Sequence, residues 1–128
     1  MITAILTATM IITGWASQYA PGVMDRVVHV RQYHHSPPSL PIEHESVAGY
    51  IAVQSCAEMG NIWWIKPIDQ DMWEPHMVAD CSGSRETSEW MLRNNILLEL
   101  SWDTVLRWGG KPRRGMRIER LILPNGGQ

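Results

Sequence analysis

The sequence predicts a mainly β domain that closes into a small barrel and carries one or two short helices. Short apolar runs rich in β-branched and aromatic residues follow one another closely and are separated by Gly, Pro and Asn turns. Only short segments show a helical period, so a parallel sheet flanked by long helices is disfavoured. Closure into a barrel also leaves no long edge strand exposed.

The composition is that of a globular domain with its own core. The chain has 128 residues, of which 45% are hydrophobic and 19% charged, and its formal net charge is −2. These values argue against disorder and against a nucleic-acid-binding surface, and we expect no cofactor. Seven tryptophans and no phenylalanine favour surfaces that stack flat ligands such as sugar rings, although tryptophan also fills cores.

Residues 1–13 are apolar and rich in threonine, and the first basic residue of the chain is Arg26. The β-branched content suits a strand or an ordered arm. A degenerate or truncated signal sequence is the alternative, although the positive charge that opens a secretory signal is missing. The segment is too short for a transmembrane helix, so we expect no stable membrane span. The barrel domain is expected to cover residues 14–128.

A strand and a long loop are predicted next. The mixture of valines and polar residues at 25–32 is interpreted as a strand. Residues 33–46 form a loop, because three prolines remove backbone donors and hold the chain extended. The loop contains three histidines and two glutamates, but it lacks a zinc-binding spacing such as HExxH, so we interpret it as solvated and expect no metal site.

Short strands separated by turns dominate the rest of the chain. They are expected at 50–54, 62–65, 77–80 and 96–100, with a closing strand around 116–123.

Two helices are expected among these strands. Residues 86–94 are interpreted as a short helix capped by Ser84 or Thr87. The best-signalled helix covers 102–108: Ser101 caps it, and two glycines follow its end.

Two carboxylates are set into apolar strands, and they indicate a site. Asp80 ends the strand at 77–80, and Glu99 lies within the strand at 96–100. Burying an acid costs free energy, so two acids at matching places suggest a function that needs them. Their separation in sequence allows one strand and a connection between them, so they can meet in one groove. The simpler alternative for Glu99 is a carboxylate that faces solvent or pairs with Arg107 or Arg113.

The two cysteines, Cys56 and Cys81, each lie near the end of a predicted strand. They are free buried thiols if the protein is cytosolic, and a single bridge if it is secreted. We favour the bridge, because a crosslink at Cys81 would fix the position of Asp80 next to it.

Three stretches resemble the double-psi β-barrel superfamily. Gly14-Trp15-Ala16-Ser17-Gln18-Tyr19 resembles the opening motif of rare lipoprotein A-like, expansin and barwin-related domains, and Val78-Ala79-Asp80-Cys81 resembles their acidic strand end. The run from Leu98 to Leu106 resembles their strand followed by a short helix. The three-aspartate domain of murein transglycosylases is similar as well, with Ile51-Ala52-Val53, the Met59-Gly60 turn and Ala79-Asp80 in its order. The resemblance covers residues 14 to about 109.

The resemblance implies a six-stranded double-psi barrel whose groove takes a polysaccharide, in bacteria usually peptidoglycan. In the lytic and hydrolytic members, the acid matched by Glu99 protonates the glycosidic oxygen, and Asp80 matches a second acidic position. Ser17, Tyr19, Trp15 and Trp102 would line the groove and bind substrate. The family carries Asp where Glu99 stands, and the first acid of the three-aspartate domain falls at about Gln54.

Three functions follow as hypotheses. The first is a peptidoglycan-cleaving lytic transglycosylase or glycosidase in the cell envelope or outside the cell. The second is a non-catalytic module that binds glycan or loosens the wall, with tryptophans such as Trp15, Trp73 or Trp102 stacked on sugar rings. The third is a structural barrel of a larger assembly, such as a phage particle.

Overall fold

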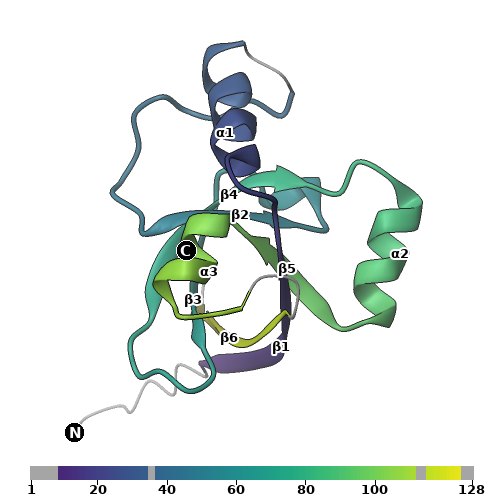
Figure 1. Cartoon of the computed structure of the whole chain (residues 1–128). Coiled ribbons are helices and arrows are strands. Elements are labelled where there is room, and N and C mark those ends of the chain that lie inside the picture. The colour runs from purple at the N-terminus through teal and green to yellow at the C-terminus, as the bar shows by residue number, and fades with distance from the viewer. Residues whose placement is uncertain (1–8, 35–36, 112–114, 125–128) are drawn as a thin grey trace, which may run out of the picture.

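The computed structural model describes residues 9–34, 37–111 and 115–124, and it consists mainly of β-strands with three short α-helices in these ranges (Figure 1). The elements, in chain order, are β1 (Met10–Gln18), α1 (Val23–Tyr33), β2 (Gly49–Val53), the 3-10 turn η1 (Cys56–Glu58), β3 (Ile62–Pro67), β4 (Glu74–Cys81), α2 (Arg85–Arg93), β5 (Ile96–Leu100), α3 (Trp102–Arg107) and β6 (Met116–Ile122).

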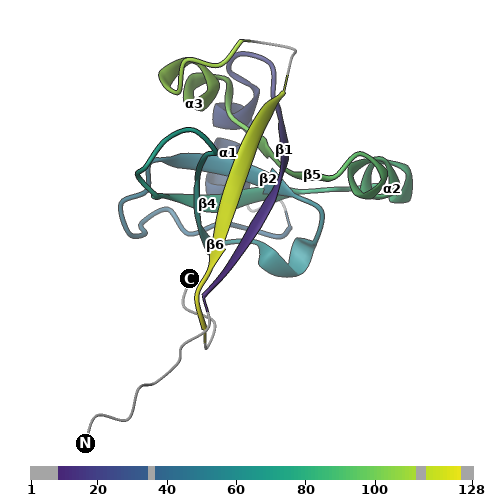
Figure 2. The same cartoon turned by 90° about the horizontal axis from the view of Figure 1, so that it is seen from below.

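The six strands form one sheet that closes on itself in the order β1-β5-β2-β4-β3-β6. β6 pairs antiparallel with β1, so each of these strands has two neighbours. β1 and β5 are parallel, β2 and β4 are parallel, and the remaining pairs are antiparallel. Figure 2 shows β1 and β6 side by side along the molecule. The prediction of a mainly β domain with a closed sheet is confirmed.

The chain consists of two interlocked halves with the same pairing scheme. The first half is β1–α1–β2–β3 and the second is β4–α2–β5–β6. If β1 is exchanged with β4, β2 with β5 and β3 with β6, each strand pair becomes a pair that also exists in the sheet and has the same direction. For example, the parallel pair of β1 and β5 becomes the parallel pair of β4 and β2. Each parallel pair takes one strand from each half, so neither half can complete its sheet alone.

Apolar side chains fill the inside of the closed sheet. Seven of these core residues come from five strands and are almost completely buried: Ile51, Val53, Ile65, Val78, Leu98, Leu100 and Ile118. A second apolar cluster lies outside the sheet, where α1 packs its Met24 and Val28 against Ala52, Met77 and Ala79. α1 therefore covers the outer face of β2 and β4 (Figure 1).

The prediction of a strand at 25–32 is wrong, because α1 occupies this segment. Met24 and Val28 are four residues apart and form the buried face of one helix, which packs against the sheet. Gly22 precedes the helix with φ of 76°, a conformation that glycine adopts without strain. Tertiary packing here overrides the strand preference of the valines.

The later elements lie close to their predicted places. β5 begins and ends as expected, and Ser84 and Ser101 each accept a backbone hydrogen bond as the caps of α2 and α3. β4 begins earlier than expected, at Glu74, and includes Pro75. β1 takes in residues 10–13 of the N-terminal segment, whose residues 1–8 lie outside the described ranges. Within the described part of the chain, none of the helices is long and apolar enough to cross a membrane.

Candidate functional site

A row of four side chains crosses the outer face of four neighbouring strands. Ser17 on β1 pairs with Glu99 on β5, Glu99 pairs with Ala52 on β2, and Ala52 pairs with Asp80 on β4. Directly paired residues project from the same face of a sheet. Ala52 belongs to the cluster beneath α1, so this is the outer face. Strands lie about 4.8 Å apart, which places the Cα atoms of Asp80 and Glu99 about 10 Å apart.

Both carboxylate oxygens of Asp80 are occupied. Arg31 on α1 donates from Nη2 to Oδ1 at 2.5 Å, and the Tyr19 hydroxyl, just beyond β1, donates to Oδ2 at 2.6 Å. The adjacent Cys81 forms a disulfide with Cys56, which confirms the predicted bridge. The Asp80 carboxylate is therefore held in place by an ion pair with Arg31 and a hydrogen bond from Tyr19, next to the bridge at Cys81.

Glu99 is the contrasting acid. Its side chain is half-buried and forms no hydrogen bond or ion pair with any described residue. Burial raises the pKa of the Glu99 carboxyl, and the negative charge of Asp80 raises it further. A carboxyl in this setting holds its proton closer to neutral pH, which a general acid requires.

Tyr19 and Ser17 lie beside the two acids. Burial raises the pKa of the Tyr19 hydroxyl above its ordinary value, and its hydrogen bond to Asp80 adds to the shift, so it remains a donor. The Ser17 hydroxyl oxygen is buried and has no partner among the described residues. Tyr19 therefore contacts Asp80, and Ser17 lies beside Glu99 on the neighbouring strand.

The two acids open into the same hollow. Its volume is about 210 Å³, and Tyr19, Asp80 and Glu99 line it together with Thr87 and Met91 of α2. The sequence-based expectation that the acids meet in one groove agrees with this geometry.

Two further hollows are lined by members of the row. One of about 380 Å³ lies along α1 and includes Arg31 and Asp80. The other, of about 480 Å³, is lined by Trp15, Ser17 and Trp90. Each member of the row therefore lines at least one of the three hollows, and Asp80 lines two of them.

The predicted aromatic residues have different places. Trp15 is 42% exposed and lines the hollow beside Ser17. Trp102 starts α3 and lines none of the three hollows that follow the row. Trp73 lies between β3 and β4, where the Lys66 ammonium sits over its ring at 5.2 Å.

The simpler alternative of an ion pair between Glu99 and Arg107 is wrong. Arg107 donates to Glu74 at 2.8 Å, on β4. Arg113, the other candidate, lies outside the described residues. Asp103 stands in the first turn of α3 and lines a separate hollow, as expected for a helix-start acid.

Sequence reasoning missed two residues of the site. One is Arg31, which lies in the segment predicted as a strand and reaches Asp80 only through the tertiary fold. The other is Trp90 on α2, which is 42% exposed and shares a hollow with Trp15.

Among the described residues, the histidines of the loop at 33–46 do not form part of a metal-ligating group. His44 bonds to the Tyr50 hydroxyl at 2.8 Å, and the described residues contain no group of three side chains that could hold a metal ion. His35 lies outside the described ranges.

Comparison with protein families, curated proteins and solved structures finds no match to this chain.

Proposed function

We propose that the protein acts on a cell-wall polysaccharide, the glycan strand of peptidoglycan, and that Glu99 is its general acid. The observation that carries the proposal is that two unlike acids line one open hollow. Asp80 is held by an ion pair and a hydrogen bond, whereas Glu99 is unpaired within the described chain and its pKa is raised. Two carboxyl groups in different environments are the usual arrangement of a glycoside-cleaving site.

The arrangement favours a reaction that needs one acid. Glu99 gives its proton to the glycosidic oxygen as the bond to the anomeric carbon breaks. A hydroxyl of the same sugar then attacks that carbon, and its proton returns to the Glu99 carboxylate. Asp80 is engaged by Arg31 and Tyr19, so its role is to supply a fixed negative charge near the developing positive charge on the sugar ring.

The double-psi arrangement belongs to this proposal. Its support is the interlocked pairing of two equivalent halves, in which each parallel pair combines strands of both. The positions of the motifs also support it: Tyr19 follows β1, Asp80 lies near the end of β4, and α3 directly follows β5.

An oxidising compartment, outside the cell or in its envelope, is part of the same proposal. The bridge between Cys56 and Cys81 supports it, because disulfides persist mainly in such compartments.

The experiment is a cleavage assay on purified peptidoglycan sacculi. Glu99→Gln keeps the size and polarity of the side chain but removes the transferable proton, so the release of soluble muropeptides should fall by about a hundredfold or more. Glu45→Gln, on the exposed loop before β2, is the matched control and should cleave like the wild type. Full activity of the Glu99→Gln variant would contradict the proposal.

Non-catalytic glycan binding is the second candidate, and the hollow between Trp15 and Trp90 favours it. Two exposed indoles beside hydroxyl and amide side chains suit the face of a sugar ring. Sedimentation of the wild type with sacculi, without any soluble product, would favour this candidate over cleavage.

A further inference from the structure

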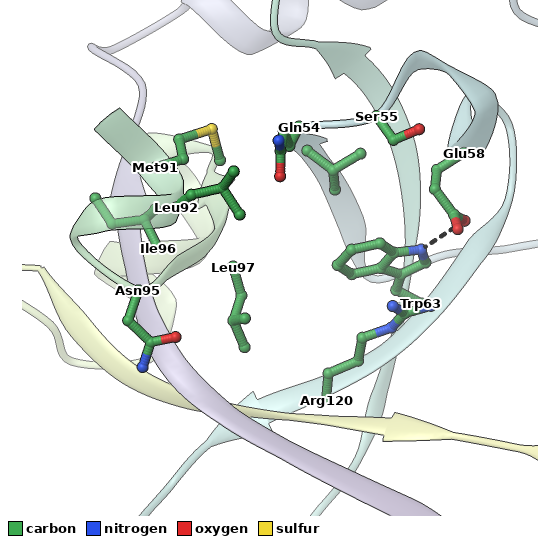
Figure 3. A pocket seen from close by; sticks show the side chains of 11 residues that line it. Gln54, Ser55, Glu58, Trp63, Met91, Leu92, Asn95, Ile96, Leu97 and Arg120 are labelled. Carbon is green, nitrogen blue, oxygen red and sulfur yellow. Dashed lines mark hydrogen bonds between the residues drawn. The ribbon is translucent and has the colours of Figure 1, made fainter. Parts of the chain in front are cut away.

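A separate hollow of about 280 Å³ lies between η1, β3 and the turn from α2 to β5 (Figure 3). It adjoins the acid-lined hollow at Val53 and Met91, which line both. Most of its wall is apolar, and three aliphatic side chains line one part of it: Leu92, Ile96 and Leu97. Gln54, Ser55 and Asn95 add neutral polar side chains to the wall, and the two charged side chains are Glu58 and Arg120. Both charged side chains lie beside Trp63 (Figure 3).

Arg120 occupies a position in β6 that faces the inside of the closed sheet. Its strand neighbour two residues earlier, Ile118, is completely buried, and its direct partner on β3 is the completely buried Ile65. Because side chains alternate along a strand, Arg120 projects to the same side as Ile118. A charged side chain at such a position is costly and calls for a compensating partner.

The structure shows a stacking partner for Arg120 but no acceptor. Its guanidinium lies over the Trp63 ring, 3.5 Å from the ring centre. No described residue accepts a hydrogen bond from it or pairs with it as an ion, and its Nε is buried without a partner. Burial lowers the pKa of Arg120, yet a guanidinium stays charged at any physiological pH. The cation therefore faces the hollow with unused donors (Figure 3).

Glu58 is the nearest acid in this hollow, and it is already engaged elsewhere. Its Oε2 accepts from the Trp63 indole at 3.2 Å and from the Asn61 amide at 3.0 Å. The Asn61 bond chiefly lowers the pKa of Glu58, so it is ionised. Its charge acts on Arg120 from a distance without a contact ion pair, and it disfavours a doubly charged ligand such as phosphate.

We propose that this hollow binds a single carboxylate carried on a small apolar stem. The Arg120 guanidinium would hold the carboxylate in a two-pronged hydrogen bond, its preferred geometry with this group. The apolar wall at Val53 and Leu97 would contact the stem, as in most small-ligand pockets. This proposal does not depend on the proposed function, and Glu99→Gln should leave the binding unchanged.

The test is a titration of the full chain followed by NMR at the Trp63 indole N–H and the Arg120 Nε–H. Isobutyrate is the probe, and isobutyramide, of the same shape but uncharged, is its control. Isobutyrate should shift both signals with a Kd on the order of 1 mM, and the amide should bind at least about tenfold more weakly. Equal binding of acid and amide, or no shift from either, would overturn the proposal.

Three variants sharpen this test. Arg120→Gln should weaken isobutyrate binding at least about tenfold, whereas Arg117→Gln should not change it. Arg117 lies on the same strand and over another tryptophan, Trp15, but it is exposed. Glu58→Gln should tighten binding several-fold, because it removes the opposing charge while its amide oxygen still accepts from the indole. Unchanged or weaker binding in Glu58→Gln would contradict the charge argument even if Arg120→Gln fails to fold.

The source of the carboxylate is distinguished by a peptide pair. A tripeptide ending in valine with a free carboxyl end is compared with the same tripeptide ending in an amide. Tighter binding of the free-acid peptide than of isobutyrate indicates a peptide C-terminus as the ligand, and weaker binding indicates a small free acid. A peptide amide that binds as tightly as the free acid would overturn the proposal.

Discussion

The two halves of the sheet share one pairing scheme but differ in chemistry. In the first half, β1 and β2 contribute the neutral Ser17 and Ala52 to the row across the outer face, whereas β4 and β5 of the second half contribute Asp80 and Glu99 at the corresponding places. The shared scheme builds the floor of the groove, and the difference in side chains places both acids in one half. The two halves therefore share the strand pairing, and the side chains at equivalent positions decide which half carries the acids.

The helices of the two halves differ as well. α1 buries Met24 and Val28 and sends Arg31 to Asp80, across to the other half. α2 buries only Met91 among its described residues and leaves Trp90 exposed. α1 therefore holds Asp80 in place, whereas α2 lines the hollows next to the acids.

The largest effect on stability is expected from the bridge between η1 and β4, which ties the first half to the second. Replacing both cysteines, in Cys56→Ser with Cys81→Ser, should lower the free energy of unfolding by about 3.5 kcal/mol, because the closed loop is lost from the unfolded chain. Urea unfolding measures this change. A loss below about 1 kcal/mol would mean that strand pairing alone holds the halves together.

The second largest effect on stability is a pH dependence caused by His76 on β4. The counterpart strand β1 has no histidine. The side chain is completely buried between Glu74 and the ring of Trp108, and burial lowers its pKa to about 4. The folded state therefore favours the neutral imidazole, whereas the unfolded chain takes up a proton below about pH 6.5. The free energy of unfolding is therefore highest above pH 6.5 and falls by about 3 kcal/mol as the pH drops towards 4. Urea unfolding across this range should show a smaller fall in His76→Leu, and identical profiles would contradict the account.

The third prediction compares the arginines of the two helices. Arg31→Ala leaves the mostly buried Asp80 without its cation and should cost about 2 kcal/mol. Arg85→Ala on α2 breaks an exposed pair with Glu89 and should cost about 0.5 kcal/mol or less. The urea unfolding midpoints of the two variants measure this difference. Similar midpoints would contradict the claim that the ion pair of α1 stabilises the protein more than the ion pair of α2.

The smallest effect is expected on glycan binding, from the exposed Trp90 of α2. Trp90→Ala should weaken sedimentation with sacculi about fivefold, since one stacking face is lost. Trp102→Ala should sediment like the wild type, because Trp102 lines none of the three hollows along the row. A greater loss of sedimentation in Trp102→Ala than in Trp90→Ala would indicate that the glycan binds near α3 instead of along the row.

Much of the fold could be predicted locally. The strands around Val78 and Leu98 are apolar runs bounded by turns, and Ser84 and Ser101 cap their helices as the sequence indicates. α1 could not be predicted, because its valines favour a strand and only packing against the sheet makes it a helix.

The site was predictable in its acids but not in their partners. Asp80 and Glu99 stand out because acids are rare in apolar strands, whereas the pairing of Arg31 with Asp80 joins residues 49 positions apart through the tertiary fold. Arg120 gave no signal, since a basic residue in a closing strand is ordinary until its neighbours are known.

The most direct test of the central claim is the pKa of the Glu99 carboxyl, measured by NMR titration of its carboxyl carbon. The account predicts a pKa above the ordinary value of 4.5, because burial and the charge of Asp80 both favour the protonated form. In Asp80→Asn the pKa should move down towards that value, although burial alone keeps it raised. A Glu99 pKa at or below 4.5 in the wild type would contradict its role as the general acid.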